Sequence, residues 1–277
     1  SIGYQNTNKC DLIMHSSPET IARGVLTLTI TKWNGKLVTI ENFNIRVRNP
    51  NVIMTVETNP EVMAILYQYC SHRMSGSDYL LKSEAISFTD SDFYVSNTAG
   101  IFKGSNIQFF NEFAEFTGIE VIPAFCFSGS TMLKEITLPE SIKEIKQSAF
   151  NNVGLDSLTI PMNVETINQQ AFESADITTF AVDNRNLKFC SRGGNIYLGI
   201  RPETLYILAP KITEYTMPEE TTSVYSDGAE TWRYASDLVK ITLNGRVQGI
   251  SGAWFKYGMS QLKSVVGPER SDVKFYN

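Results

Sequence analysis

The sequence predicts a mainly β fold with short helices, in which repeats of 22–23 residues stack into a solenoid. A recurring phenylalanine is the first observation behind this prediction, since Phe127, Phe150 and Phe172 follow one another at nearly constant spacing. Apolar residues recur in the same order around it, and they include short alternating stretches typical of strands. Because one such unit cannot bury its own apolar side, neighbouring units are expected to share a continuous core.

Each repeat is expected to contain a turn, a short strand, a corner and a second short strand. Leu158 and Ile160 alternate with polar residues, as a half-buried strand requires. The preceding Ile-x-x-x-Ala-Phe pattern fits one helical or 3₁₀-like turn, in which Phe fills the core and Ala allows close approach. Pro139, Pro161 and Pro218 follow the expected strand ends, where a missing amide donor does least harm.

We count about five repeats, with a weak first copy at Phe113, Phe116 and Ile119. Between the third clear copy and the later ones, residues 183–210 interrupt the pattern with short apolar runs broken by Gly193-Gly194. This segment is interpreted as a protruding hairpin excursion from one solenoid turn. Trp232 falls in a Phe position of the repeat and Trp254 lies beside one, so both are expected to pack in the core.

The residues before the repeats predict two smaller parts. Residues 1–57 are expected to form an antiparallel β module with strands at 25–30, 37–40 and 44–48, because Asn34-Gly35 is a strong hairpin signal. Residues 58–106 are expected to form a helix–loop–helix that caps the solenoid, with Asn59-Pro60 at the start of the first helix. Residues 107–277 complete the division as the repeat solenoid. Trp33 beside the hairpin turn is either an exposed contact or, more simply, a turn-flanking residue.

Composition restricts the classes of protein that remain. The chain has 277 residues, 42% of them hydrophobic and 19% charged, which suits a folded protein with a sizeable core. The net charge of −5 and the lack of a basic patch argue against nucleic acid as a partner. No apolar run approaches the ~20 residues that a membrane-spanning helix needs. The chain opens Ser1-Ile2-Gly3, and we expect that any export signal or lipid anchor has been removed.

No metal site, cofactor or catalytic site is predicted. Counting back from Glu84 as the twelfth position of a calcium loop puts Arg73, Ser75 and Ser77 at ligand positions and Asp78 where Gly is required, which argues against Ca²⁺. Cys70 and His72 could in principle form a nucleophile and base, but no orienting third group is recognisable. His15 lies in a polar stretch as well.

The four cysteines do not define the compartment. Cys10, Cys70, Cys126 and Cys190 have no metal-knuckle spacing, and free thiols are favoured over two disulfides. Cys126 takes the place of the repeat alanine, so it is interpreted as a small buried hydrophobic residue.

The repeats at 136–150 (ITLPESIKEIKQSAF) and 158–172 (LTIPMNVETINQQAF) resemble the BspA-like family of bacterial leucine-rich-repeat proteins. The resemblance covers roughly residues 107–267. It implies a secreted or surface-anchored protein of a Bacteroides-like bacterium, whose relatives are associated with adhesion and protein binding. Glu84-Ala85 resembles the end of a calcium-loop-like segment that often stands in this place in the family. The step from repeat to adhesion rests on analogy.

The exposed side of the strand row is the candidate binding surface, because side chains at equal repeat positions stack into ladders. Its candidate residues are Lys134, Glu135, Thr137, Asp156, Ser157, Thr159, Thr178, Thr179, Lys240 and Thr242. The simpler interpretation is that threonine favours exposed strand positions.

Three functions remain open at this point. A non-enzymatic binding or adhesion protein for a host or bacterial surface protein or glycan comes first. A structural stalk that displays the N-terminal β module is the alternative, and an accessory module of a larger surface enzyme is the third.

Overall fold

The computed structural model describes residues 2–4, 10–12, 22–31, 37–47, 50–225, 229–247, 249–251, 260–267 and 274–276. Up to residue 47, and at 229–230, 249–251 and 274–276, only the backbone is described. The chain divides into two compact units, residues 1–53 and 54–277, and each is considered by itself. The predicted three-part division at residues 57 and 106 stays a prediction.

The described residues of the first unit form two antiparallel strand pairs. Strand β1 (Ile2–Tyr4) pairs with β2 (Cys10–Leu12), and β3 (Ala22–Thr31) pairs with β4 (Leu37–Val47). The long β3–β4 hairpin agrees with the predicted strands at 25–30 and 37–40. The separate third strand at 44–48 is wrong, because β4 runs on to Val47 and a register shift between Leu26 and Leu28 absorbs the irregularity. The Asn34-Gly35 turn, Trp33 and His15 lie outside the described residues.

The second unit begins with the short elements of the cap. They are β5 (Val52–Thr55, which spans the unit boundary), α1 (Pro60–Cys70), η1 (Ser71–Arg73), β6 (Tyr79–Leu81), α2 (Lys82–Ala85), η2 (Asp90–Phe93), β7 (Tyr94–Ser96) and β8 (Ala99–Gly100). Helix α1 begins at Pro60 as predicted. Asn59 stands at the N-cap position, but its side chain makes no capping bond and instead donates from Nδ2 to the carbonyl of Phe109, at 2.8 Å. The cap is thereby bonded to the first repeat.

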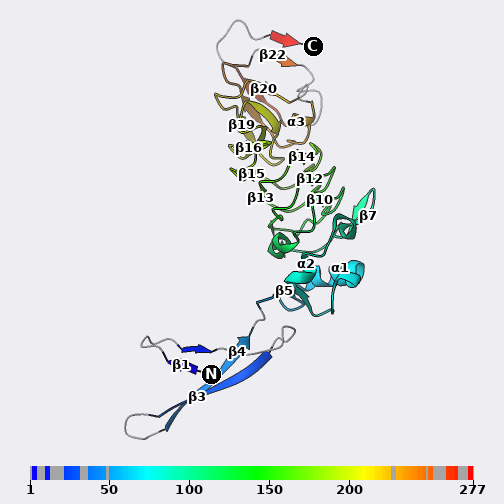
Figure 1. Cartoon of the computed structure of the whole chain (residues 1–277). Helices are drawn as coiled ribbons and strands as arrows, with labels where there is room; N and C mark the ends of the chain where they lie inside the picture. Colours follow the sequence, from blue (N-terminus) through cyan, green and yellow to red (C-terminus); the bar gives the residue numbers. More distant parts are fainter. Residues whose placement is uncertain are drawn as a thin grey trace. The chain divides into compact units, whose positions relative to one another are not determined.

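Two rows of parallel strands follow, stacked along the solenoid (Figure 1). The first strand row contains three sheets: β9 (Phe109–Phe110) with β11 (Glu135–Ile136), β13 (Ser157–Ile160) with β15 (Thr179–Val182), and β19 (Glu214–Thr216) with β21 (Lys240–Thr242) and β23 (Ser264–Val266). The second strand row contains β10 (Val121–Ile122), β12 (Glu144–Ile145), β14 (Thr166–Ile167), β20 (Ser223–Val224), β22 (Gly249–Ser251) and β24 (Lys274–Tyr276). The described part of the unit also has the short helices η3 (Asn111–Glu115) and α3 (Ala229–Arg233).

A column of stacked phenylalanine rings runs through the core. The centroids of Phe102 and Phe127 lie 5.1 Å apart, those of Phe127 and Phe150 5.2 Å, and those of Phe150 and Phe172 5.8 Å, all with nearly parallel planes. All four side chains are buried, which confirms the core-filling role predicted for the repeat Phe. The column starts one repeat earlier than the sequence indicated, since Phe102 precedes the expected first copy. Its repeat was missed because Ile101 stands where the later repeats have Cys or Ala before the Phe, and because the step to Phe127 is longer.

A second regularity concerns the backbone between repeats. Gly104, Gly129, Asn152 and Ser174 stand at equivalent positions and have φ values of +66°, +79°, +52° and +56°. The N–H groups of Gly104 and Asn152 donate to Ser128 and Glu173 of the following repeats at 2.8 and 2.9 Å. The stack therefore requires a left-handed residue here, which glycine adopts freely and other residues adopt with strain.

The interruption is a hairpin, but it does not protrude. Strands β16 (Phe189–Arg192), β17 (Asn195–Leu198) and β18 (Thr204–Ile207) are antiparallel neighbours, which agrees with the predicted strands. However, β18 also pairs in parallel with β20, and Ile196, Tyr197 and Leu205 are fully buried. The expected protrusion is thus wrong. The hairpin takes the place of part of a repeat within the stack. Its apolar side chains are buried there.

Behind the hairpin lies a second core cluster. The hydroxyl oxygens of Tyr197 and Tyr215 are 3.1 Å apart, and the rings of Tyr215 and Trp232 meet edge to face. Trp232 is fully buried, as predicted for a residue in the Phe position. Trp254 lies outside the described residues, so its predicted burial stays a prediction.

Candidate functional site

The structure brings most of the predicted binding residues onto one exposed face of the first strand row. Glu135, Ser157, Thr159 and Thr179 are exposed, while the apolar residues between them point into the core. Ser157 pairs directly with Thr179, and Thr159 pairs with Ala181. The side chains at equal repeat positions therefore form columns across the strands, as the repeat pattern predicted.

Several residues of this surface are held by hydrogen bonds within the protein. Lys134 donates from Nζ to the carbonyl of Gly154 at 3.0 Å, and Thr178 donates from Oγ1 to the Asp156 carboxylate at 3.0 Å. Thr137 donates to Asn111 Oδ1 at 3.0 Å. These bonds connect successive repeats, so Lys134, Asp156, Thr178 and Thr137 contribute to the stack as well as to the surface.

Lys240 and Thr242 stand apart from the others. They lie on β21, in the sheet after the hairpin, and both are half-buried. The turn at Gly193-Gly194 lies against β15, where the carbonyl of Gly194 accepts the N–H of Phe180 at 2.8 Å. The surface is therefore divided into one part over β9, β11, β13 and β15 and another over β19, β21 and β23.

Sequence reasoning missed several exposed residues of this face, among them Phe109 and Thr216. Phe109 on β9 pairs with Glu135 and is 52% exposed, and Thr216 on β19 pairs with Thr242. Phe109 was overlooked because the first repeat departs from the consensus. Thr216 could have been found, since it precedes Met217-Pro218 as Thr159 precedes Ile160-Pro161.

The second strand row carries a charged column that the sequence did not reveal. Lys143 donates from Nζ to Glu120 Oε1 at 2.7 Å. This bond, helped by the nearby carboxylates of Glu165 and Asp90, raises the pKa of Lys143 above its ordinary value. Lys143 and Glu120 are each about half exposed, so the pair lies at the surface and is screened by solvent.

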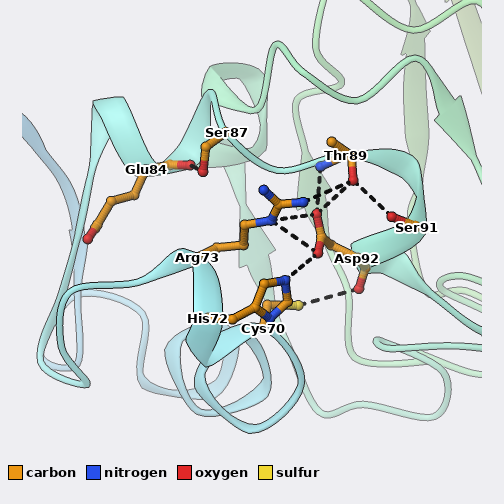
Figure 2. A network of polar contacts seen from close by, with 8 residues as sticks. All are labelled: Cys70, His72, Arg73, Glu84, Ser87, Thr89, Ser91 and Asp92. Atoms are coloured by element: carbon orange, nitrogen blue, oxygen red, sulfur yellow. Dashed lines mark hydrogen bonds and ion pairs between the residues drawn. The ribbon is translucent and has the colours of Figure 1, made fainter.

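Cys70 and His72 do not form a nucleophile and base. Figure 2 shows both beside Asp92, which accepts from Arg73 Nε at 3.1 Å and whose Oδ1 lies 2.9 Å from His72 Nε2. The Cys70 thiol instead faces the backbone carbonyl of Asp92 at 3.3 Å. Burial raises the pKa of Cys70 to about 12, so the thiolate that a nucleophile needs is disfavoured. This cluster bonds the end of α1 to η2.

Glu84, which stands at the twelfth position of the calcium-loop count, finds its hydrogen-bond donors within the protein. Its carboxylate accepts the N–H of Leu81 at 2.8 Å and both the N–H and the hydroxyl of Ser75. Arg73, at the first position of that loop, pairs with Asp92. In the described part of the chain, no three His, Cys, Asp or Glu side chains gather where they could hold a metal ion.

The cysteines whose side chains are described are free. Cys126 is fully buried, which confirms its predicted place in the core, and burial raises the pKa of its thiol well above the usual range. Cys70 is buried and Cys190 half-buried. Among the described helices, none is long and apolar enough to cross a bilayer.

Comparison with known families identifies the repeat. The model of the family described as "BspA type Leucine rich repeat region" matches residues 81–192 in six copies. The match begins before the predicted start of the solenoid at residue 107, which agrees with the early start of the Phe column. No curated protein matches the chain.

Several solved structures are similar over part of the chain. The pneumococcal vaccine antigen PcpA is 25% identical, with a TM-score of 0.44, over 55% of this chain and 38% of its own. A leucine-rich-repeat protein from Eubacterium ventriosum is 18% identical, with a TM-score of 0.38, over 54% of both chains. A leucine-rich cell surface protein from Faecalibacterium prausnitzii is 15% identical, with a TM-score of 0.32, over 56% of this chain and 59% of its own. The chain thus spans less than two thirds of each.

The parallel strand rows, the Phe column and the six matched copies agree with one another. Residues 81–192 are therefore a leucine-rich-repeat region of the BspA type.

Proposed function

We propose that this protein is a non-enzymatic binding module that acts outside the cell or on its outer surface. The observation that carries the proposal is the exposed face of the first strand row. Glu135, Ser157, Thr159 and Thr179 present polar side chains from successive repeats, and their strands are fixed by the core behind them. Such a face suits a partner that is contacted at many shallow positions. The location follows from the BspA-type repeat by analogy.

The partner class is a protein or a glycan of a host or bacterial surface. A stalk that displays the first unit, or an accessory module of a larger enzyme, would leave the strand row without a direct contact. Substitutions on the first strand row distinguish these functions. They should weaken partner binding if the row is the binding site and leave it unchanged under either alternative.

The test uses a double substitution in the centre of the face. Ser157→Arg with Thr179→Arg places two bulky cations on paired, exposed positions, and we expect little loss of stability because such sites contribute about ±0.5 kcal/mol each. Binding of the whole chain to a panel of purified matrix proteins and mucin glycans would be measured by biolayer interferometry. We expect the variant to lose binding that the parent shows.

The matched control is Glu61→Arg with Glu173→Arg. Neither of these residues belongs to the first strand row. The control should bind as the parent does. Equal binding by the parent and by the Ser157→Arg/Thr179→Arg variant would contradict the proposal and favour a site elsewhere, including the first unit.

A further inference from the structure

A groove lies at the place where the hairpin divides the first strand row. One wall is Arg192 at the end of β16 with the following Gly193. The other runs from Thr216, the last residue of β19, to Glu220. The volume of the groove is 320 Å³, and it is shallow and widely open to solvent. That volume is at the lower end of the range for small-ligand sites, so one side chain of a partner fits better than a larger molecule.

Both walls are fixed by bonds that do not involve the groove-facing groups. Asn244 donates from Nδ2 to the carbonyls of Pro218 and Thr221, and the buried Thr221 hydroxyl donates to the carbonyl of Pro202 at 2.6 Å. On the opposite side, the Gly193-Gly194 turn is bonded to β15 through the N–H of Phe180. The groove is therefore preformed and needs no rearrangement to admit a ligand.

The charged groups face each other without closing the groove. Nη2 of Arg192 lies 4.0 Å from Oε1 of Glu220, which is too long for a hydrogen bond, and both side chains are more than half exposed. Glu219 also lines the groove. With one guanidinium and two carboxylates, the lining has a net negative charge that favours a cation.

The lining of the groove also has an apolar part. Pro218 and the little-exposed edge of Met217 line it beside the charged residues. Lysine and arginine side chains have this division, with an aliphatic stem and a charged end. The residues that line the groove include no aromatic ring of the kind on which sugar rings stack.

From this arrangement we propose that the groove binds a basic side chain, lysine or arginine, of a partner polypeptide. The ammonium or guanidinium group is placed between the carboxylates of Glu219 and Glu220, and the aliphatic stem lies on Met217 and Pro218. This inference rests on the proposed binding function and names a second contact for it, beside the exposed face over β13 and β15, since the Gly193-Gly194 turn lies against β15.

The experiment measures binding of short blocked peptides to the full chain by ¹H–¹⁵N correlation spectra. Acetyl-Gly-Lys-Gly-amide should shift the amide signals of Gly193, Glu219 and Glu220 in a saturable manner. The norleucine analogue, which keeps the stem and lacks the charge, should bind much more weakly. The glutamate analogue should produce no saturable shift.

Substitutions then separate charge from shape. Glu219→Gln with Glu220→Gln should weaken the lysine peptide about tenfold, because two solvent-exposed ion pairs are lost. Arg192→Gln should strengthen it, because a repelling cation is removed. The control Glu61→Gln with Glu173→Gln removes the same charge elsewhere and should leave the affinity unchanged.

Three results would overturn the inference: equal affinity for the lysine and norleucine peptides, unchanged affinity after the Glu219/Glu220 substitutions, or saturable binding of a neutral monosaccharide in the groove. Failure of the strand-row binding proposal would give a different result. If Ser157→Arg/Thr179→Arg leaves partner binding intact while the lysine peptide still shifts Gly193, the strand-row proposal fails and the groove stands.

Discussion

Asp90 Oδ1 accepts the backbone N–H of Glu120 at 2.8 Å, in the place where a backbone carbonyl stands in the later repeats. It also accepts the N–H of Val121, at 2.9 Å. One repeat on, the carbonyl of Glu120 accepts the N–H groups of Lys143 and Glu144, and the carbonyl of Lys143 accepts those of Glu165 and Thr166. A carboxylate of the cap thus ends the ladder of the second strand row.

Replacing Asp90 tests this role. Asp90→Ala leaves two N–H groups at the edge of β10 without their acceptor, and we expect a loss of about 1–3 kcal/mol in the free energy of unfolding. Urea denaturation would measure it, and hydrogen exchange should become faster at Glu120 and Val121. Asp90→Asn keeps an oxygen in the same place and should lose less. Equal stability of Asp90→Ala and the parent would show that the cap does not depend on this bond.

The Phe column should carry much of the stability of the stack. Phe150 packs between Phe127 and Phe172, so Phe150→Ala leaves a cavity and should cost about 3–5 kcal/mol. Thermal and urea melts would measure the loss. Phe109→Ala, at a 52% exposed position, is the matched control and should cost far less. A melting temperature of Phe150→Ala close to that of the parent would contradict the assigned register.

Ser174 offers a stabilising substitution. Its φ of +56° lies in the left-handed region, which Gly104 and Gly129 adopt at the equivalent positions. Ser174→Gly removes the backbone strain that the Cβ causes in the folded state. This relief exceeds the entropic stabilisation that glycine gives the unfolded chain, so the free energy of unfolding should rise by about 0.5–1 kcal/mol. Thr159→Gly, at an exposed position of strand β13, should destabilise. A loss of stability in Ser174→Gly would refute the strain argument.

Protonation of Asp92 should lower the stability of the protein at acidic pH. Burial by itself raises its pKa, but hydrogen bonds from the N–H of Thr89 and from Arg73 outweigh it and hold the pKa below the ordinary value. A depressed folded pKa contributes stability above the unfolded value of about 4, and this contribution is lost as the pH falls through the folded pKa.

The measurement compares melting temperatures of the parent and Asp92→Asn between about pH 7 and about pH 2. The parent should be more stable near neutral pH, and the difference should shrink in acid. Asp176→Asn, at an exposed position, is the control and should give a small, nearly constant difference. A parent–Asp92→Asn difference that does not change with pH would contradict the assignment.

Calcium should have no effect on this protein. The Glu84 carboxylate is already used by Ser75 and Leu81, and Arg73 stands at the first position of the loop. Calorimetric titration with millimolar Ca²⁺ after chelation should give no binding heat and no change in melting temperature. Glu84→Ala should destabilise equally with and without Ca²⁺. A saturable curve that Glu84→Ala abolishes would restore the loop as a metal site.

The sequence by itself determined the repeat, its period and its core. Spacing alone identifies Phe127, Phe150 and Phe172, because the burial of one side chain per repeat is a local requirement that recurs at each copy. It also predicted the exposed polar positions Ser157, Thr159 and Thr179, since alternation along a strand fixes which side chains point outward.

Only the tertiary structure decided how the irregular segments close the stack. Asp90 replaces a backbone carbonyl, Asn59 bonds to Phe109, and Arg192 faces Glu220. Each of these contacts joins residues 28 to 50 positions apart. The hairpin was expected to protrude because its local pattern is that of any hairpin. Its burial follows from the parallel pairing of β18 with β20, which no local spacing encodes.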